Sequence, residues 1–167
     1  MPYSVLSTIA RGAAAIALAL ALTTGTLLVG AASPASALTA SSTGGSPAGS
    51  VEETFTAKLN HARAARGIPK LALNSELVRV AREQASRMAA RSVLYHNPRL
   101  TQDVSNWRWV GENVGYGPDA LTVHVAFMQS PGHRANILDR DYTQVGIGSV
   151  VVNGRVWVAE VFRQPMR

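Results

Sequence analysis

The sequence feature that most constrains the fold is the pair of β-branched runs on either side of Asn153-Gly154. Asn-Gly between two apolar runs is the strongest short signal for a β-hairpin, because a type I′ turn needs positive φ at both positions. In the first run, Gly146 and Gly148 alternate with apolar residues. One face of that strand therefore lacks side chains at two positions, and we expect a helix or a ligand to approach it closely.

Three segments with helical periodicity precede the hairpin. Apolar residues recur at helical spacing over residues 51–66, 75–91 and 119–129, which predicts three helices. Ser50 and Glu53 have the spacing of a capping box, which predicts that the first helix starts there.

The order of these elements indicates the fold class. Pro131-Gly132 is expected to break the third helix, and residues 109–114 are expected to add at least one strand to the hairpin. Helices first and strands last are typical of α+β proteins, in which helices cover a sheet. We therefore predict an α+β sandwich.

The N-terminal part of the chain has the pattern of an export signal. Arg11 precedes a long apolar run that ends in an Ala-Ser-Ala cleavage site at residues 35–37. We predict a signal peptide at residues 1–37, a flexible linker at 38–50 and one folded domain at 51–167. The alternative is an uncleaved anchor, since about 20 apolar residues can span a bilayer. Cleavage predicts a secreted, extracellular protein without a stable membrane anchor.

The composition limits the stabilising forces and the partners. The chain has no cysteine, so the predicted domain relies on packing rather than on disulfides. Removing Arg11 with the signal leaves 15 of the 16 Lys and Arg against 10 Asp and Glu, a formal charge of +5. This charge favours anionic partners, although the scattered Arg residues could simply keep the surface soluble. Aromatic and basic residues are not interleaved, so we expect no nucleic-acid partner, and we expect a monomer.

Four segments of the sequence together resemble one family. They read "LNHARAARGIPKLALNSEL", "YHNP", "GENV" and "FMQSPGHRANILDRDYTQVGIG". In this order and at these distances they resemble the CAP superfamily, or SCP/TAPS domain, in its bacterial secreted branch, over nearly all of residues 52–163. The resemblance implies a three-layer α-β-α sandwich around an antiparallel sheet, in agreement with the α+β prediction.

The resemblance also implies a central cleft in which two His and two Glu can bind a divalent cation. His96 in "LYHNP" and Glu112 in "GENV" match two of these positions. Ser130 stands at the position of the second Glu and Asp141 at that of the second His, so two positions depart from the family pattern. His133 is an extra histidine typical of the bacterial branch. The expected cleft comprises His96, Glu112, Asn113, Ser130, His133, Arg134 and Asp141.

Two interpretations of this set remain open. His96, Glu112 and His133 could supply three ligands to zinc or another divalent cation and leave a fourth position for water. Asp141 would then add an oxygen ligand or orient an imidazole. Alternatively, the Gly-His-Arg-x-Asn turn is a hydrogen-bonded cluster without metal, in which Arg134 pairs with a carboxylate or stacks on a tyrosine.

The predicted function is binding. CAP domains are linked to binding of lipids, cations or proteins, often without turnover, so the resemblance favours a module for a lipid, a cell-wall component, a protein ligand or a divalent cation. The alternative is a metal-assisted extracellular hydrolase that uses His96, Glu112 and His133. A hydrolase based on Ser130 and His133 is disfavoured, because the chain has no Gly-x-Ser-x-Gly segment.

Overall fold

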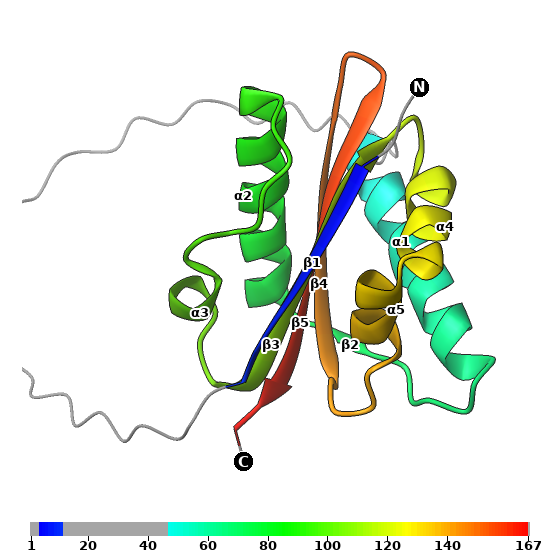
Figure 1. The fold of residues 1–167 in the computed structure, drawn as a ribbon, viewed down its shortest axis with the longest axis vertical. Helices are drawn as coiled ribbons and strands as arrows, with labels where there is room; N and C mark the ends of the chain where they lie inside the picture. The colour runs from blue at the N-terminus through cyan, green and yellow to red at the C-terminus, as the bar shows by residue number, and fades with distance from the viewer. Residues whose placement is uncertain (1–3, 12–46, 167) are drawn as a thin grey trace, which may run out of the picture.

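The computed structural model describes residues 4–11 and 47–166. Its elements in chain order are β1 (Ser4–Arg11), α1 (Pro47–Ala64), β2 (Ala72–Leu73), α2 (Ser75–Arg91), α3 (Leu100–Asp103), β3 (Trp107–Gly117), α4 (Ala120–Gln129), α5 (Pro131–Leu138), β4 (Gln144–Val152) and β5 (Arg155–Pro165). Figure 1 shows the sheet edge-on between two layers of helices. Over the described ranges, no helix is both long and apolar enough to span a membrane.

The helices cover both faces of a five-stranded sheet with the order β1-β3-β5-β4-β2. Neighbouring strands are antiparallel, apart from β2, which pairs two residues in parallel with β4. α2 and α3 cover one face, and α1, α4 and α5 cover the other (Figure 1). Two hydrophobic clusters fill the interfaces between the layers. The predicted α+β class and the α-β-α sandwich are confirmed.

The β4–β5 hairpin has the predicted turn and the predicted close approach. Asn153 and Gly154 have φ of 51° and 69°, as a type I′ turn requires. A Cβ on Gly146 or on Gly148 would overlap the backbone of α2. The side-chain-free face of β4 therefore receives a helix, one of the two occupants that the sequence predicted.

The start of α1 differs from its prediction. The helix begins at Pro47, so Ser50 lies in its first turn and the residues from 47 to 50 are helical instead of linker. The main-chain carbonyl of Ser50 accepts a hydrogen bond from the hydroxyl of Thr54, at 2.9 Å. Proline is favourable at the first helical position, because its missing N–H would be unpaired there anyway. By contrast, α2 has the predicted bounds, and Asn74 caps it by accepting from the amide of Leu77 at 3.2 Å.

A second proline also begins a helix where the sequence was expected to break one. α4 ends at Gln129, as predicted, but Pro131 then opens the two-turn helix α5. The break at Pro131-Gly132 is therefore a change of helix direction, with Ser130 as the residue between the two helices. α5 carries His133 and Asn136 to the sheet.

The first described segment forms an edge strand. β1 pairs antiparallel with β3 from Ser4, opposite Tyr116, to Arg11, opposite Trp109. β1 belongs to the segment predicted to be a signal peptide. The predicted cleavage site at residues 35–37 and most of the apolar run lie outside the described residues.

A buried arginine connects the end of α1 to the segment between α5 and β4. Arg63, near the end of α1, is 1% exposed. Its guanidinium donates to four main-chain carbonyls, those of Pro69, Ile137, Asp139 and Tyr142, at 2.7 to 3.2 Å. Burial lowers the pKa of Arg63 from its usual value. This side chain ties α1 to the α5–β4 connection in a chain that has no cysteine.

Candidate functional site

β3 presents polar residues to the two faces of the sheet. Side chains alternate along a strand, and Val110 and Val114 lie in the hydrophobic cluster with α2. Glu112, between them, therefore faces the α2 layer. Asn113 faces the opposite layer, where its amide donates to the main-chain carbonyl of His133 on α5 at 3.2 Å.

The first half of the site is a buried carboxylate that holds the loop after α2. Oε2 of Glu112 lies 2.8 Å from Nδ1 of His96 and accepts from the amide of Asn97 at 2.9 Å. The side chain of Glu112 is fully buried, whereas that of His96 is 26% exposed. A carboxylate only accepts, so it selects the tautomer of His96 with hydrogen on Nδ1.

The second half is a chain of buried amides on the α5 side. The Nδ2 group of Asn136 donates to Oδ1 of Asn113 at 2.9 Å. Nδ2 of Asn113 in turn donates to Oε2 of Glu160 at 2.9 Å. These three side chains are fully buried. The network fixes α5 against β3, because Asn113 also holds the carbonyl of His133.

Sequence reasoning missed Glu160, although a signal for it existed. Glu160 is the only acidic residue in the apolar run of β5, and such a residue must be buried if the strand is central. Burial raises its pKa to about 8, and the hydrogen bond from Asn113 lowers the pKa by a smaller amount. Glu160 is therefore mostly protonated at neutral pH. A neutral carboxylic acid can be buried at far lower cost than a carboxylate.

His133 is part of the second half and is packed rather than exposed. It is 3% exposed, and its ring stacks on Phe127 with centroids 4.9 Å apart. Nδ1 lies 2.7 Å from the hydroxyl of Ser130, three residues earlier. In a Ser-His-acid triad the serine contacts Nε2 and the acid contacts Nδ1, so this pair has the reverse orientation. The Ser130–His133 contact is a local link at the start of α5.

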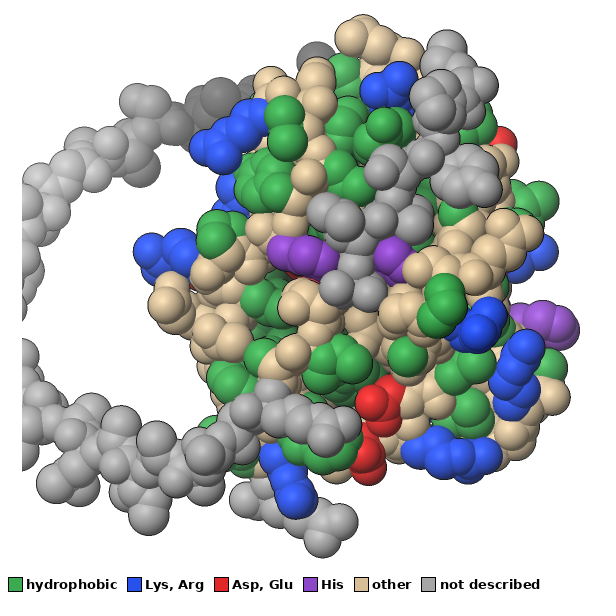
Figure 2. All heavy atoms as spheres, viewed as in Figure 1, with side chains coloured by type: hydrophobic (Ala, Val, Ile, Leu, Met, Phe, Trp, Pro, Cys, Tyr) green, Lys and Arg blue, Asp and Glu red, His purple; other side chains and the backbone are tan. Residues whose placement is uncertain are grey.

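The structure divides the predicted cleft residues into groups. His96 and Glu112 come together on the α2 side, and Asn113, Ser130 and His133 come together on the α5 side. The other two lie at the surface. Arg134 is exposed and donates to the carbonyl of Met128 instead of to a carboxylate, and Asp141 is exposed in the loop before β4. Figure 2 shows two separate histidine side chains near the middle of the face that has β1 in front in Figure 1.

The arrangement does not form the three-ligand metal site. Among residues 4–11 and 47–166, no three or more His, Cys, Asp or Glu side chains are grouped so that they could hold a metal ion. Glu112 faces one layer and His133 belongs to the other, with the sheet between them. The residues present therefore do not fit a zinc centre in this arrangement, and we derive no metal-dependent step from them.

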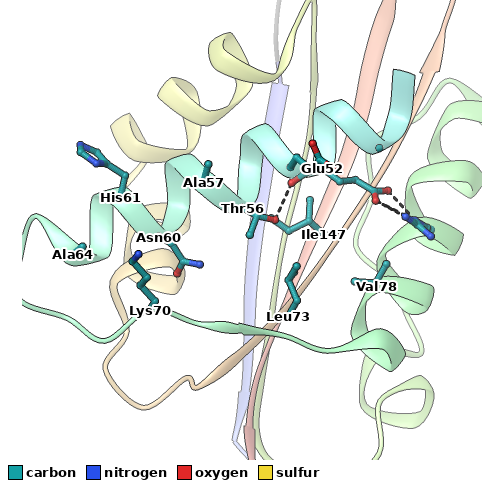
Figure 3. A pocket seen from close by; sticks show the side chains of 13 residues that line it. Glu52, Thr56, Ala57, Asn60, His61, Ala64, Lys70, Leu73, Val78 and Ile147 are labelled. Atoms are coloured by element: carbon teal, nitrogen blue, oxygen red, sulfur yellow. Dashed lines mark hydrogen bonds and ion pairs between the residues drawn. The ribbon is translucent and has the colours of Figure 1, made fainter. Parts of the chain in front are cut away.

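A separate pocket lies at the opposite edge of the sheet. It has a volume of about 710 Å³ and is lined by α1, the segment around β2, α2 and Ile147 of β4. Its floor is apolar and includes Leu73 and Val78, and Leu73 is 59% exposed. Figure 3 shows His61 and Lys70 at one end of this pocket. None of the predicted cleft residues lines it.

An ion pair closes the other end of the pocket. The two carboxylate oxygens of Glu52 accept from Arg82 on α2, with the shortest contact at 2.6 Å (Figure 3). Oε1 of Glu52 also accepts from the amide of Ser149 at 3.1 Å. Glu52 therefore links α1, α2 and β4. Sequence reasoning placed weight on the neighbouring Glu53 and missed this role.

The fold and the polar edge of β3 define a domain class of the α-β-α sandwich type. A family model described as "CAP: Cysteine-rich secretory protein family" matches residues 56–161. The chain belongs to this family, and the resemblance found in the sequence is confirmed. Although the family is described as cysteine-rich, this member contains no cysteine. None of the curated proteins compared with the chain matches it.

Solved structures share the fold at low sequence identity. An extracellular SCP-domain protein of Bacillus anthracis is 21% identical with a TM-score of 0.63, over 70% of this chain and 41% of that one. An outer surface protein of Borrelia burgdorferi is 15% identical with a TM-score of 0.65, over 70% and 94%. A cysteine-rich secretory protein of Staphylococcus aureus is 20% identical with a TM-score of 0.52, over 71% and 40%. The chain thus spans about two fifths of the Bacillus and Staphylococcus proteins.

Proposed function

We propose that the chain is an extracellular binding module and that its ligand is an amphipathic molecule with an acyl chain and an anionic head, held in the pocket between α1 and α2. The observation that carries this proposal is the pocket itself. Its volume of about 710 Å³ lies within the range of about 300–1,000 Å³ that is typical of small-molecule sites. The descriptions of related structures as extracellular or outer-surface proteins support the location.

The apolar part of the pocket supports an acyl chain. Leu73, Val78 and Ile147 form the floor, and alanines of α1 form one wall. Leu73 is apolar but 59% exposed. Covering such a surface with a ligand removes apolar area from water at about 25 cal/mol per Å². Binding of a ligand with an aliphatic part would therefore be favoured by the burial of this apolar surface.

The polar rim supports an anionic head at one end only. Lys70 and His61 lie at that end, and the ion pairs between described residues include neither of them. At the other end Arg82 is already neutralised by Glu52. A negatively charged head would therefore lie beside Lys70, with the chain extending toward Val78.

The geometry supports hydrolysis less well than binding. The residues proposed for a metal-assisted hydrolase do not form one metal-binding group within the described part of the chain. The buried His96–Glu112 pair and the Asn113–Glu160 pair are instead engaged in holding loops and helices. We therefore propose binding without turnover.

The proposal is tested by displacement of a fluorescent fatty acid with palmitate. The unmodified chain should bind palmitate saturably and should bind hexadecanol, which lacks the charge, more weakly. Leu73→Asp should weaken palmitate binding at least about ten-fold, because it places a charged carboxylate against the acyl chain on the apolar floor. Leu73 is more than half exposed, so the substitution is expected to leave the fold intact.

Leu121→Asp is the matched control. Leu121 is 52% exposed on α4 and does not line the pocket. It should leave palmitate binding unchanged. Absence of saturable binding, or equal losses in the two variants, would reject the pocket as the ligand site.

A further inference from the structure

The outer edge of β3 is occupied by a strand that export would remove. β1 pairs with β3 over eight residues, from Ser4 to Arg11. All eight lie before the predicted cleavage site at residues 35–37. Without β1, β3 would end the sheet with a row of unpaired main-chain N–H and C=O groups. Such an edge is a template for a further strand.

The edge also has features that suit a strand backbone. The amide group of Asn136 donates to the carbonyl of Thr8 at 3.2 Å, in addition to its bonds within the domain. A Cβ on Gly111 would lie 3.0 Å from that same carbonyl. A side chain at this position would first overlap the hydroxyl of Tyr142 and would also crowd the incoming strand. Asn136 and Gly111 both favour a peptide main chain at the site.

The resident strand shows which side chains the edge accepts. Thr8 and Ala10 lie opposite Glu112 and Val110, on the α2 side of the sheet, and both are half-buried. Ile9 alternates with them and is 43% exposed. At residues 8–10, therefore, the resident strand carries small residues opposite Glu112 and Val110 and a large residue on the exposed face between them.

From these observations we infer that the outer edge of β3 is a docking site for an extended peptide that places small residues opposite Glu112 and Val110 and a large residue between them. In the uncleaved chain residues 4–11 fill the site. After cleavage, a strand from another polypeptide takes their place in antiparallel register, between the His96–Glu112 pair and the α5 network. Main-chain hydrogen bonds hold it, and the positions opposite Glu112 and Val110 select small side chains. The site is independent of the proposed ligand pocket, which lies at the opposite edge of the sheet.

The test uses the full chain with a specific protease site placed within residues 38–46. A fluorescein-labelled peptide of residues 4–11 is added before and after cleavage, and its anisotropy is measured. The cleaved chain should bind the peptide saturably. The uncleaved chain should bind at least about ten-fold more weakly, because a tethered strand competes at an effective concentration in the millimolar range. Displacement of the cleaved N-terminal fragment by excess peptide, seen by gel filtration, would support the site in the same way.

Two peptide variants supply the specificity control without altering the domain. Thr8→Trp in the peptide places a large ring opposite Glu112 and should weaken binding at least about ten-fold. Ile9→Trp on the exposed face should change binding less than about three-fold. No saturable binding after cleavage, equal binding before and after cleavage, or equal effects of the two variants would each overturn the inference.

Discussion

The two edges of the sheet in this protein are built on different principles. At the β3 edge, buried polar side chains satisfy one another, from Glu112 on one face to Asn113 and Glu160 on the other. At the β4 edge, β2 contributes only two paired residues, and the space between α1 and α2 remains open over an apolar floor. The first edge is therefore suited to main-chain pairing, and the second to burial of a small apolar ligand.

The comparison shows why polar residues in a sequence are an incomplete guide to a binding site. The His and Glu residues that attract attention in the sequence are engaged in hydrogen bonds that stabilise the fold. The residues that line the open pocket include alanines, Leu73 and Val78, which are unremarkable in sequence. A buried polar network orders a structure, whereas an exposed apolar hollow can still gain energy from a ligand.

The largest expected effect is the loss of stability that follows removal of the buried guanidinium of Arg63. Arg63→Met should reduce the free energy of unfolding by about 3–5 kcal/mol, because it leaves buried carbonyls without a donor and unties α1 from the α5–β4 connection. Chemical denaturation would measure this. Arg66→Met is the control, since Arg66 is exposed just after α1 and its guanidinium donates to the main-chain carbonyl of Ala62 near the end of that helix. A loss below about 1 kcal/mol for Arg63→Met would contradict the role assigned to this residue.

The next largest effect is expected at the contact between β4 and α2, beside the pocket. Gly148→Ala should destabilise the domain by at least about 2 kcal/mol, because its methyl group would overlap the backbone of α2 at Arg82. The melting temperature and the affinity for palmitate should both decrease. Gly49→Ala, in α1 beside the same pocket, should be neutral or stabilising by about 0.5–1 kcal/mol, since a Cβ there meets nothing within 4 Å. Similar melting temperatures for the two variants would show that α2 can move away from β4.

The third prediction concerns pH dependence at the β3 edge. The pKa of Glu160 is raised to about 8 in the fold, against an ordinary value of 4.5 in the unfolded chain. The folded state therefore binds more protons between these values, and the stabilisation that Glu160 contributes is complete below pH 4.5 and lost as pH rises through 8. Between pH 6 and 8 this amounts to about 2 kcal/mol.

Glu160→Gln should remove that loss. Gln resembles the protonated acid in shape and can still accept from Asn113. Its unfolding free energy should change less than that of the original chain between pH 6 and 8, and at pH 8 the variant should be the more stable protein. Parallel pH profiles for the two chains would mean that Glu160 does not titrate in this range.

The smallest effect concerns the rim of the pocket. Lys70→Ala should weaken palmitate binding by about two- to five-fold, because an exposed charge pair contributes about 0.5–1 kcal/mol. High salt should reduce the difference. Lys58→Ala is the matched control, since Lys58 is the other lysine after residue 50, is exposed and lies outside the pocket. Equal losses of palmitate affinity in the two variants would mean that the carboxylate head of the ligand does not lie beside Lys70.

Local signals predicted much of the fold. The bounds of α2 follow from its cap at Asn74 and its apolar stripe, and the hairpin follows from Asn153-Gly154. The predicted start of α1 was wrong, because the helix begins at Pro47. The break at Pro131-Gly132 was correct, but α5 itself was not predicted, since proline in a sequence is equally compatible with ending a helix and with beginning one. β1 had no signal at all, since its residues resemble part of an export signal.

The sites were less predictable than the fold. The His96–Glu112 pair and the second group around His133 could be named from the resemblance, but their placement on opposite faces depends on the alternation of β3. Glu160 could have been identified as an acid within an apolar strand. The pocket could not, because its walls come from segments that meet only when α1 and α2 cover opposite faces of one sheet edge.

The most direct test of the binding account is a thiol footprint of the pocket, which the absence of cysteine makes possible. Ala57→Cys introduces one thiol on an exposed position of α1 that lines the pocket, and Ser86→Cys introduces one on the exposed face of α2 outside it. With palmitate at ten times its dissociation constant, alkylation of the Ala57→Cys protein should slow by roughly ten-fold, because only about one pocket in eleven is free. Alkylation of the Ser86→Cys protein should not change. Equal alkylation rates of the Ala57→Cys protein with and without bound palmitate would contradict the assignment of this pocket as the ligand site.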